Sequence, residues 1–481
     1  MNNTLKSFTN ILYINRFGLL IFGCLSLVTA IVLATVPSIT APPKQTDQIK
    51  ITTKLSQTKL VKGDINTVYL DVNIKPPSID VKQSAQRASD LIVVLDSSGS
   101  MSEANKMSFA KEAIHDLLSR LNDNDRFALV SFADGAIIHS PLVAVNSDQR
   151  AQLNAMVNNI QANGGTNMSE GLNSAVRLLA DKRQTSATKI LLLSDGHANQ
   201  GVTDLSGLSQ IVAQLTLKES VLSSIGMGLD FNEILMSSLA DYGMGNYAYL
   251  ENLSGLGEIF ARNLNATRAI FAANSTMTVT VADGVDLIDA AGYPISKDGA
   301  NTYSVTTGQL LGNSDKKFVM TFNVKAQTTG DLSLGKMHLS YQVQGENLQQ
   351  AIAQQQLTLA AVEPERRQES VASIDRDVYQ QSWIKNNLGL MQKKLSHWVR
   401  EGNKDKADQV INEYRQEVAK AEKQAAMPLA SPELDEKISA MKSSVADAFN
   451  GNRADQEIKR KRAAKSLQIG SIKEQRAEDH K

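Results

Sequence analysis

The sequence predicts an α/β protein, in which a doubly wound, mostly parallel sheet is inserted into a β-sandwich and followed by a helical bundle. Three observations support this prediction. Between residues 88 and 275, short apolar segments alternate with amphipathic ones, as expected for buried parallel strands joined by helices. On either side of this region, apolar and polar residues alternate with period two, which indicates antiparallel strands. After residue 363, apolar residues recur at three-four spacing, which indicates helices.

The composition argues against several classes of function and of site. The chain has 481 residues, enough for two to four domains at roughly 100–200 residues each. Its 50 basic and 50 acidic residues balance, which argues against a general nucleic-acid binder. Aromatic residues make up only 5% of the chain, so platforms for base stacking are not expected. The one cysteine, Cys24, excludes an intramolecular disulfide and a cysteine metal site.

An uncharged apolar run extends from Phe17 to Val36. About 20 such residues can span a bilayer as a helix. Lys6 and Arg16 precede the run and favour a cytoplasmic N-terminus. We therefore expect an anchor, with the bulk of the chain in the bacterial periplasm or at the cell surface. Two alternatives stay open: cleavage near Val28-Thr29-Ala30, which would release a secreted protein, and lipid modification of Cys24, against which the apolar run continues past the cysteine.

Each predicted element has its own pattern. Val68, Leu70, Val72 and Ile74 alternate with polar residues and indicate a sandwich strand. The buried strands of the α/β region are expected at Leu91–Leu95, Phe127–Phe132, Ile137–Val145, Ile190–Leu193, Val221–Ile225 and Tyr247–Leu250. The helices between them are expected near residues 109–121, 149–161, 169–179, 205–217 and 233–240. Further sandwich strands are expected at Thr276–Val281, Tyr303–Val305, Phe318–Val324 and Met337–Val343.

The predicted domain boundaries follow from these patterns. Because neither strand set alone supplies the roughly seven strands of a sandwich, we expect the two sets to share one. The predicted order is an N-terminal cytoplasmic segment (1–16), a transmembrane anchor or signal sequence (17–37), a linker (38–47), sandwich strands (48–87), the α/β domain (88–275), further sandwich strands (276–362), a helical domain (363–450) and a charged, disordered tail (451–481).

Oxygen-bearing side chains gather at the predicted strand ends. Asp96, Ser98 and Ser100 directly follow the strand Leu91–Leu95. Thr166 lies in the loop Gly-Gly-Thr-Asn, and Asp195 follows the strand Ile190–Leu193. The carboxyl ends of parallel strands meet at one edge of a sheet, so these side chains are expected to converge. Hard oxygen ligands suit Mg²⁺ first, with Mn²⁺ or Ca²⁺ as alternatives, rather than zinc.

The three pieces resemble the metal-ion-dependent adhesion site (MIDAS) of the von Willebrand factor A (VWA) family. The resemblance implies that Ser98, Ser100 and Thr166 bind the metal directly, and that Asp96 and Asp195 act directly or through water. The glycine-containing stretches 225–232 and 243–247 are similar to a bacterial membrane-anchored subgroup that includes the calcium-activated chloride channel homologues and resembles inter-alpha-trypsin inhibitor heavy chains. The channel activity is not implied, because the chain has one predicted span.

These features predict a non-enzymatic adhesion or scaffold protein, whose metal keeps an open position for an Asp or Glu carboxylate of a protein partner. The first alternative is an accessory subunit of a chelatase-like AAA+ ATPase, against which the predicted span argues. The second is a hydrolase using Ser98, His197 and Asp195, but no Gly-x-Ser-x-Gly elbow surrounds a serine. The basic run Lys459–Arg462 is interpreted as a solvated helix face rather than a site for lipid or nucleic acid.

Overall fold

The computed structural model describes residues 49–80, 87–182, 187–343 and 345–476. The predicted anchor at 17–37 lies outside these residues, as do Cys24 and the linker. Among the helices in the described residues, none is long and apolar enough to cross a membrane.

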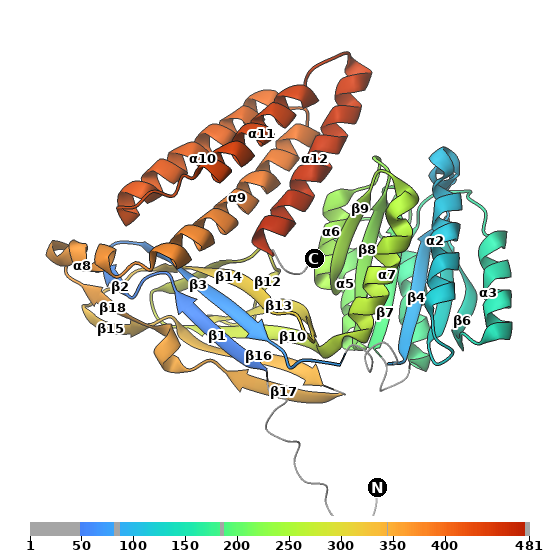
Figure 1. Cartoon of the computed structure of the whole chain (residues 1–481), viewed down its shortest axis with the longest axis horizontal. Coiled ribbons are helices and arrows are strands. Elements are labelled where there is room, and N and C mark those ends of the chain that lie inside the picture. Colours follow the sequence, from blue (N-terminus) through green and yellow to red (C-terminus); the bar gives the residue numbers. More distant parts are fainter. Residues whose placement is uncertain (1–48, 81–86, 183–186, 344, 477–481) are drawn as a thin grey trace, which may run out of the picture. The chain divides into compact units, whose positions relative to one another are not determined.

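The α/β domain is built on a six-stranded sheet with the order β6-β5-β4-β7-β8-β9 (Figure 1). All neighbours are parallel except β5 and β6, which form an antiparallel pair. The central strand β4 is buried along its whole length, as its apolar run predicts. The strands are β4 (Ser89–Asp96), β5 (Arg126–Phe132), β6 (Ala136–Ala144), β7 (Ala187–Ser194), β8 (Ser220–Met227) and β9 (Met244–Leu250).

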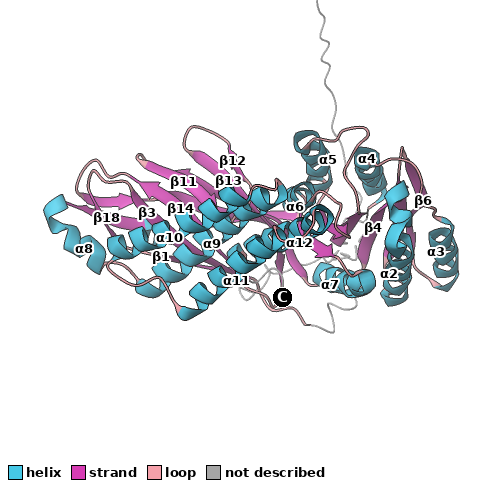
Figure 2. Cartoon of the chain, turned by 90° about the horizontal axis from the view of Figure 1, so that it is seen from above, coloured by secondary structure: helices cyan, strands magenta, loops and turns pink. Residues whose placement is uncertain are grey.

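Helices cover both faces of this sheet (Figure 2). Alternate residues of β4 point to opposite sides, so Leu91 and Val93 pack with α2, α3 and α7, whereas Ile92 and Val94 pack with α4, α5 and α6. The helices are α2 (Lys106–Arg120), α3 (Ser147–Asn159), α4 (Met168–Leu178), α5 (Leu205–Leu217), α6 (Glu233–Tyr242) and α7 (Leu256–Arg268). Short 3₁₀ turns lie at η1 (Gly99–Asn105), η2 (Leu179–Asp181) and η3 (Leu253–Gly255).

Strands from both sides of the α/β domain pair in two of the three further sheets, those that contain β3 and β2, whereas the sheet around β10 is built only from strands that follow the domain. The two larger sheets have the orders β1-β3-β14-β11 and β12-β13-β10-β16-β17, and a small third sheet pairs β15, β18 and β2. Leu70 and Val72 on β3 face Met320 and Phe318 on β14, and all four side chains belong to one apolar core. The chain thus leaves these sheets after β3, forms the α/β domain and returns to them at β10.

The strands of these sheets have the following bounds: β1 (Lys50–Leu55), β2 (Lys59–Val61), β3 (Asn66–Lys75), β10 (Ile270–Val281), β11 (Val285–Ala290), β12 (Ile295–Lys297), β13 (Thr302–Leu311), β14 (Lys316–Val324), β15 (Gly330–Ser333), β16 (Gly335–Val343), β17 (Glu346–Ala351) and β18 (Thr358–Val362). Strand β10 begins at Ile270, which is earlier than the boundary predicted after residue 275. The difference arises because the α/β domain ends with α7, a helix that the sequence patterns did not reveal.

The fold class predicted from the sequence is confirmed: a mostly parallel sheet flanked by helices is joined to further sheets and to C-terminal helices. The C-terminal part contains α8 (Arg367–Ala372), α9 (Arg376–Arg400), α10 (Lys404–Ala425), α11 (Pro432–Ala448) and α12 (Arg453–Gln475), besides the turns η4 (Gln354–Leu357) and η5 (Pro364–Arg366). Ser431 caps α11 by accepting a hydrogen bond from the Leu434 amide.

The prediction of a disordered tail over 451–481 is wrong for residues 453–475, which form α12. This helix buries Ala463, Ala464 and Leu467 in the core of the helical domain. Its basic residues meet acidic residues of the α/β domain, with Lys461 pairing with Asp230 at 2.8 Å. Basic residues that suggested a solvated, frayed segment therefore form ion pairs with residues far away in the sequence.

Candidate metal centre

Three loops meet at the carboxyl edge of the α/β sheet, as the positions of the motifs predicted. The first loop follows β4, the second precedes α4, and the third follows β7. Backbone hydrogen bonds join the first two: the Gly99 amide donates to the Gly164 carbonyl at 3.0 Å, and the Asn163 amide donates to the Ser97 carbonyl at 2.8 Å. The Asn199 amide, from the third loop, donates to the Thr166 carbonyl at 3.1 Å.

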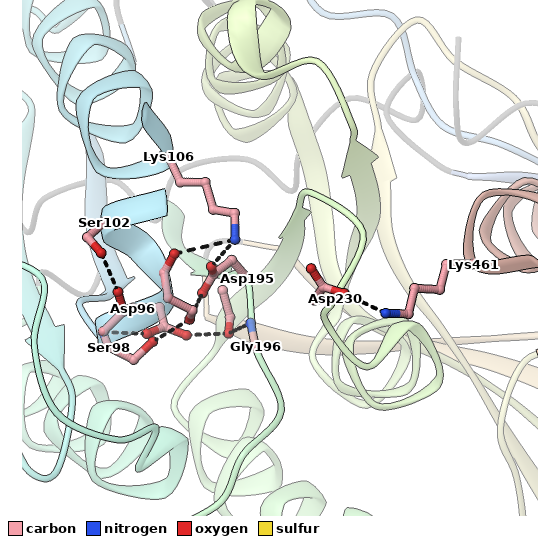
Figure 3. A network of polar contacts seen from close by, with 11 residues as sticks. Asp96, Ser98, Ser102, Lys106, Asp195, Gly196, Asp230 and Lys461 are labelled. Atoms are coloured by element: carbon pink, nitrogen blue, oxygen red, sulfur yellow. Dashed lines mark hydrogen bonds and ion pairs between the residues drawn. The ribbon is translucent and has the colours of Figure 1, made fainter. Parts of the chain in front are cut away.

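The first loop places Asp96 and Ser98 (Figure 3) and, two residues further on, Ser100. Asp96 is the last residue of β4 and is fully buried. One of its oxygens accepts a hydrogen bond from the Ser98 amide at 2.9 Å. The hydroxyls of Ser98 and Ser100 lie 3.2 Å apart. The tight turn thus gathers two hydroxyls beside one carboxylate.

The third loop adds the second carboxylate, Asp195, which is also fully buried. One of its oxygens accepts a hydrogen bond from the Ser100 hydroxyl at 2.8 Å. The preceding residue, Ser194, donates its hydroxyl to Asp96 at 2.5 Å. The two carboxylates, from neighbouring strands, are therefore linked to the same cluster of hydroxyls.

The second loop supplies Thr166. Its backbone amide donates to the Asn199 side chain at 2.8 Å, and the neighbouring Gly165 amide donates to Asp134 at 2.8 Å. Among the described residues, the Thr166 hydroxyl has no hydrogen-bond partner. A Cβ atom built on Gly196 would lie 3.6 Å from this hydroxyl and 3.8 Å from that of Ser100. Both hydroxyls therefore border one small space that a side chain at Gly196 would fill.

The electrostatics of the cluster favour a cation. Burial raises the pKa of Asp96 to about 6, and Asp195 adds to the rise, against hydrogen bonds from Ser194 and Ser98 that lower it. A buried carboxylate beside a second one is costly to ionise without a positive charge. Lys106 supplies one such charge, with its ammonium 2.6 Å from Asp195. The donors are hydroxyls and carboxylates, the oxygen ligands that suit Mg²⁺, Mn²⁺ and Ca²⁺.

The structure thus brings all five predicted residues, Asp96, Ser98, Ser100, Thr166 and Asp195, to one edge of the sheet. The motifs did not predict the supporting role of four further residues, which accept or donate hydrogen bonds in these loops or form an ion pair there: Ser194, Asn199, Asp134 and Lys106. Ser194 lies within the third motif, but nothing in the sequence indicates that its hydroxyl turns toward Asp96. No group of three or more His, Cys, Asp and Glu residues suited to a metal occurs in the described part of the chain, so hydroxyls are needed to complete the site.

Two other groups of residues bear on alternative functions, the proposed base of a hydrolase and the basic run Lys459–Arg462. His197 is exposed, and among the described residues its ring has no hydrogen-bond partner that would orient it as a base. Within the basic run, Lys461 pairs with Asp230 and Arg462 pairs with Glu251 at 2.5 Å. These two residues contact the α/β domain rather than forming a free basic face.

Parts of this chain are similar in sequence to known proteins. The family model described as the von Willebrand factor type A domain matches residues 91–197. The uncharacterized protein YfbK of Escherichia coli is 27% identical over 260 residues, which are 53% of this chain and 42% of YfbK. The inter-alpha-trypsin inhibitor heavy chain H4 of Bos taurus is 30% identical over 158 residues, 31% of this chain. The chain spans only 17% of the length of that heavy chain.

A solved structure shares the fold more broadly. The von Willebrand factor type A protein from Catenulispora acidiphila superposes with a TM-score of 0.67, covering 89% of this chain and 97% of its own, at 16% identity. This likeness extends over the further sheets and the C-terminal helices as well as the α/β domain. VWA domains generally act in metal-dependent protein–protein interaction. Residues 91–197 therefore match the von Willebrand factor type A domain, and the chain carries a VWA domain.

Proposed function

We propose that this chain is an extracytoplasmic adhesion or scaffold protein that binds a partner through a divalent cation. Asp96, Ser98, Ser100, Thr166 and Asp195 would hold the cation, with Mg²⁺ as the first choice. An Asp or Glu carboxylate of the partner would complete the coordination shell. The cation would supply an electrostatic anchor for that carboxylate, while the loops fix its position.

One observation carries this proposal: hydroxyls from separate loops converge beside two buried carboxylates at the open edge of the sheet. Neutral hydroxyl ligands leave much of a cation's charge uncompensated, so the cation attracts an external anion. The Thr166 hydroxyl supports this role, because it has no hydrogen-bond partner among the described residues and is free to bind a cation. An interaction module explains these features without a nucleophile or a base, and we propose that the protein is not an enzyme.

The proposal is tested by capturing partners with the immobilised full chain. Solubilised envelope proteins are applied in Mg²⁺ or in chelator. We expect a set of proteins that is retained in Mg²⁺, released by chelator and competed by a short peptide rich in Asp and Glu. Retention that is indifferent to chelator would contradict a metal-mediated contact. A metal-dependent hydrolytic activity that is lost both in Ser98→Ala and in His197→Ala would instead point to the hydrolase alternative.

The proposed location rests on the apolar run from Phe17 to Val36 after Lys6 and Arg16. We expect protease added to spheroplasts to digest the body of the chain beyond the anchor. A cytoplasmic protein serves as the control for intact membranes. Protection of the whole body would contradict this orientation and would favour the alternative of an accessory subunit of an AAA+ ATPase, which works in the cytoplasm.

A further inference from the structure

A lysine ammonium lies on one of the carboxylates of the candidate metal centre. The Lys106 ammonium is 2.6 Å from one oxygen of Asp195 and 3.4 Å from the carbonyl oxygen of Ser100. The Lys106 residue is 6% exposed and Asp195 is fully buried. The other Asp195 oxygen accepts the hydrogen bond from Ser100. An internal cation therefore neutralises the carboxylate that the third loop contributes.

The position of this lysine is unfavourable for the helix that carries it. Lys106 is the first residue of α2, where the positive end of the helix dipole disfavours a cation. The two preceding residues, Ala104 and Asn105, have φ values of 49° and 58°, a left-handed conformation that asparagine tolerates but that costs energy for alanine. These features are unfavourable for the helix alone, but they direct the lysine side chain toward Asp195.

Gly228, in the loop after β8, leaves room for the same side chain. A Cβ atom built on Gly228 would lie 3.3 Å from the Lys106 Cε, and its φ of +77° also favours glycine. The lysine stem is thus packed between the metal loops and the loop that leads to Asp230 (Figure 3).

We propose that Lys106 competes with the divalent cation for Asp195 and thereby sets the metal affinity of the site, an inference that rests on the proposed metal-binding function. The physical reason is that an ammonium and a divalent cation on one carboxylate repel each other strongly at such short range. Metal binding then includes the displacement of Lys106. Without metal, the ammonium keeps the buried carboxylate paired, so the fold does not need the metal.

The displaced side chain has a place to go. A depression of about 490 Å³ beside α2 is lined by Lys106, Phe109, Gly228 and Glu251, among other residues. Glu251, which pairs with Arg462, lines this depression, and Asp230, which pairs with Lys461, lies across from the Lys106 ammonium (Figure 3). The displaced ammonium therefore moves into a depression whose wall includes a carboxylate.

The test compares metal binding by the full chain with that of two lysine variants from the same helix. Lys106→Gln removes the ammonium from the centre. Lys111→Gln removes an equal charge from the same helix, where the Lys111 ammonium donates a hydrogen bond to the Asn158 carbonyl at 2.8 Å. Calorimetric titration with Mg²⁺ and with Mn²⁺ gives the dissociation constants, and thermal melts with and without metal give the shift in Tm.

We expect Lys106→Gln to bind metal about tenfold tighter or more, the scale of outer-shell effects on metal sites. Its Tm without metal should fall and its metal-induced rise should exceed that of the wild type, whereas Lys111→Gln should match the wild type in both. If Lys106→Gln folds only when Mg²⁺ is added, the inference is supported, because the metal then replaces the ammonium. Lys106→Arg, which keeps the charge, should fold without metal and bind it no more tightly than the wild type.

The possible failures are distinguishable. Equal metal affinity in the wild type and in Lys106→Gln would overturn the competition by Lys106 but leave the metal site standing. Absence of binding in both proteins would overturn the metal site itself, and the inference with it. Metal binding that appears only in Lys106→Gln would support both.

Discussion

Replacing Thr166 with alanine is expected to lower affinity for the metal-dependent partner by roughly a hundredfold, with little loss of stability. Its hydroxyl borders the space shared with Ser100 and Gly196 and has no hydrogen-bond partner among the described residues. Removing it therefore breaks no described contact within the fold. It does remove one proposed ligand of the cation, so the partner carboxylate is expected to lose part of its anchor.

The matched control is Thr166→Ser, which keeps the hydroxyl and removes only a methyl group. Partner affinity is measured for the wild type and both variants in Mg²⁺ and in chelator, alongside thermal melts. The serine variant should bind nearly as well as the wild type in Mg²⁺, and chelator should abolish the differences among the three proteins. If both variants lost affinity equally, packing of the loop rather than metal ligation would explain the loss.

Replacing Glu233 with glutamine is expected to destabilise the chain by about 3–5 kcal/mol, the usual result of removing one partner from a buried ion pair. Glu233 is 4% exposed and accepts hydrogen bonds from Arg400 of α9 at 2.8 Å and Lys465 of α12 at 3.0 Å. Although burial opposes ionisation, these two cations hold the pKa of Glu233 below its ordinary value. The substitution leaves the Lys465 ammonium buried without a carboxylate.

The control for this prediction is Asp230→Asn, which breaks an ion pair between the same two parts of the chain. Its side chain and that of Lys461 are 62% and 37% exposed, so its loss should cost at most about 1 kcal/mol. The two variants are compared by urea unfolding, followed by near-ultraviolet circular dichroism. Equal shifts of the midpoint would mean that burial does not strengthen the contact between α12 and the VWA domain.

The parts of the fold that the sequence predicted are those with a local signal. The uninterrupted apolar run Leu91–Leu95 required burial on both faces, and it forms the centre of the sheet. The alternation from Val68 to Ile74 indicated a strand with one buried face, and β3 is that strand. In both cases, the pattern of burial can be read directly from neighbouring residues.

The parts that the sequence did not predict depend on residues far apart in the chain. The charges of α12 suggested disorder because their partners Asp230, Glu233 and Glu251 lie more than two hundred positions away. The same reasoning applies to Lys106, whose partner Asp195 is on another loop. The candidate metal ligands could be predicted because their motifs mark the ends of strands that have a local signal of their own.

The most direct test of the metal centre is a crystal of the full chain soaked in Mn²⁺, with diffraction measured at a wavelength where manganese scatters anomalously. We predict one strong anomalous peak in the space bordered by the hydroxyls of Ser98, Ser100 and Thr166, within coordination distance of these oxygens. In the same map, the Lys106 ammonium should have left Asp195. A well-ordered map with Mn²⁺ bound elsewhere, or with no peak at saturating Mn²⁺, would contradict a metal centre at these residues.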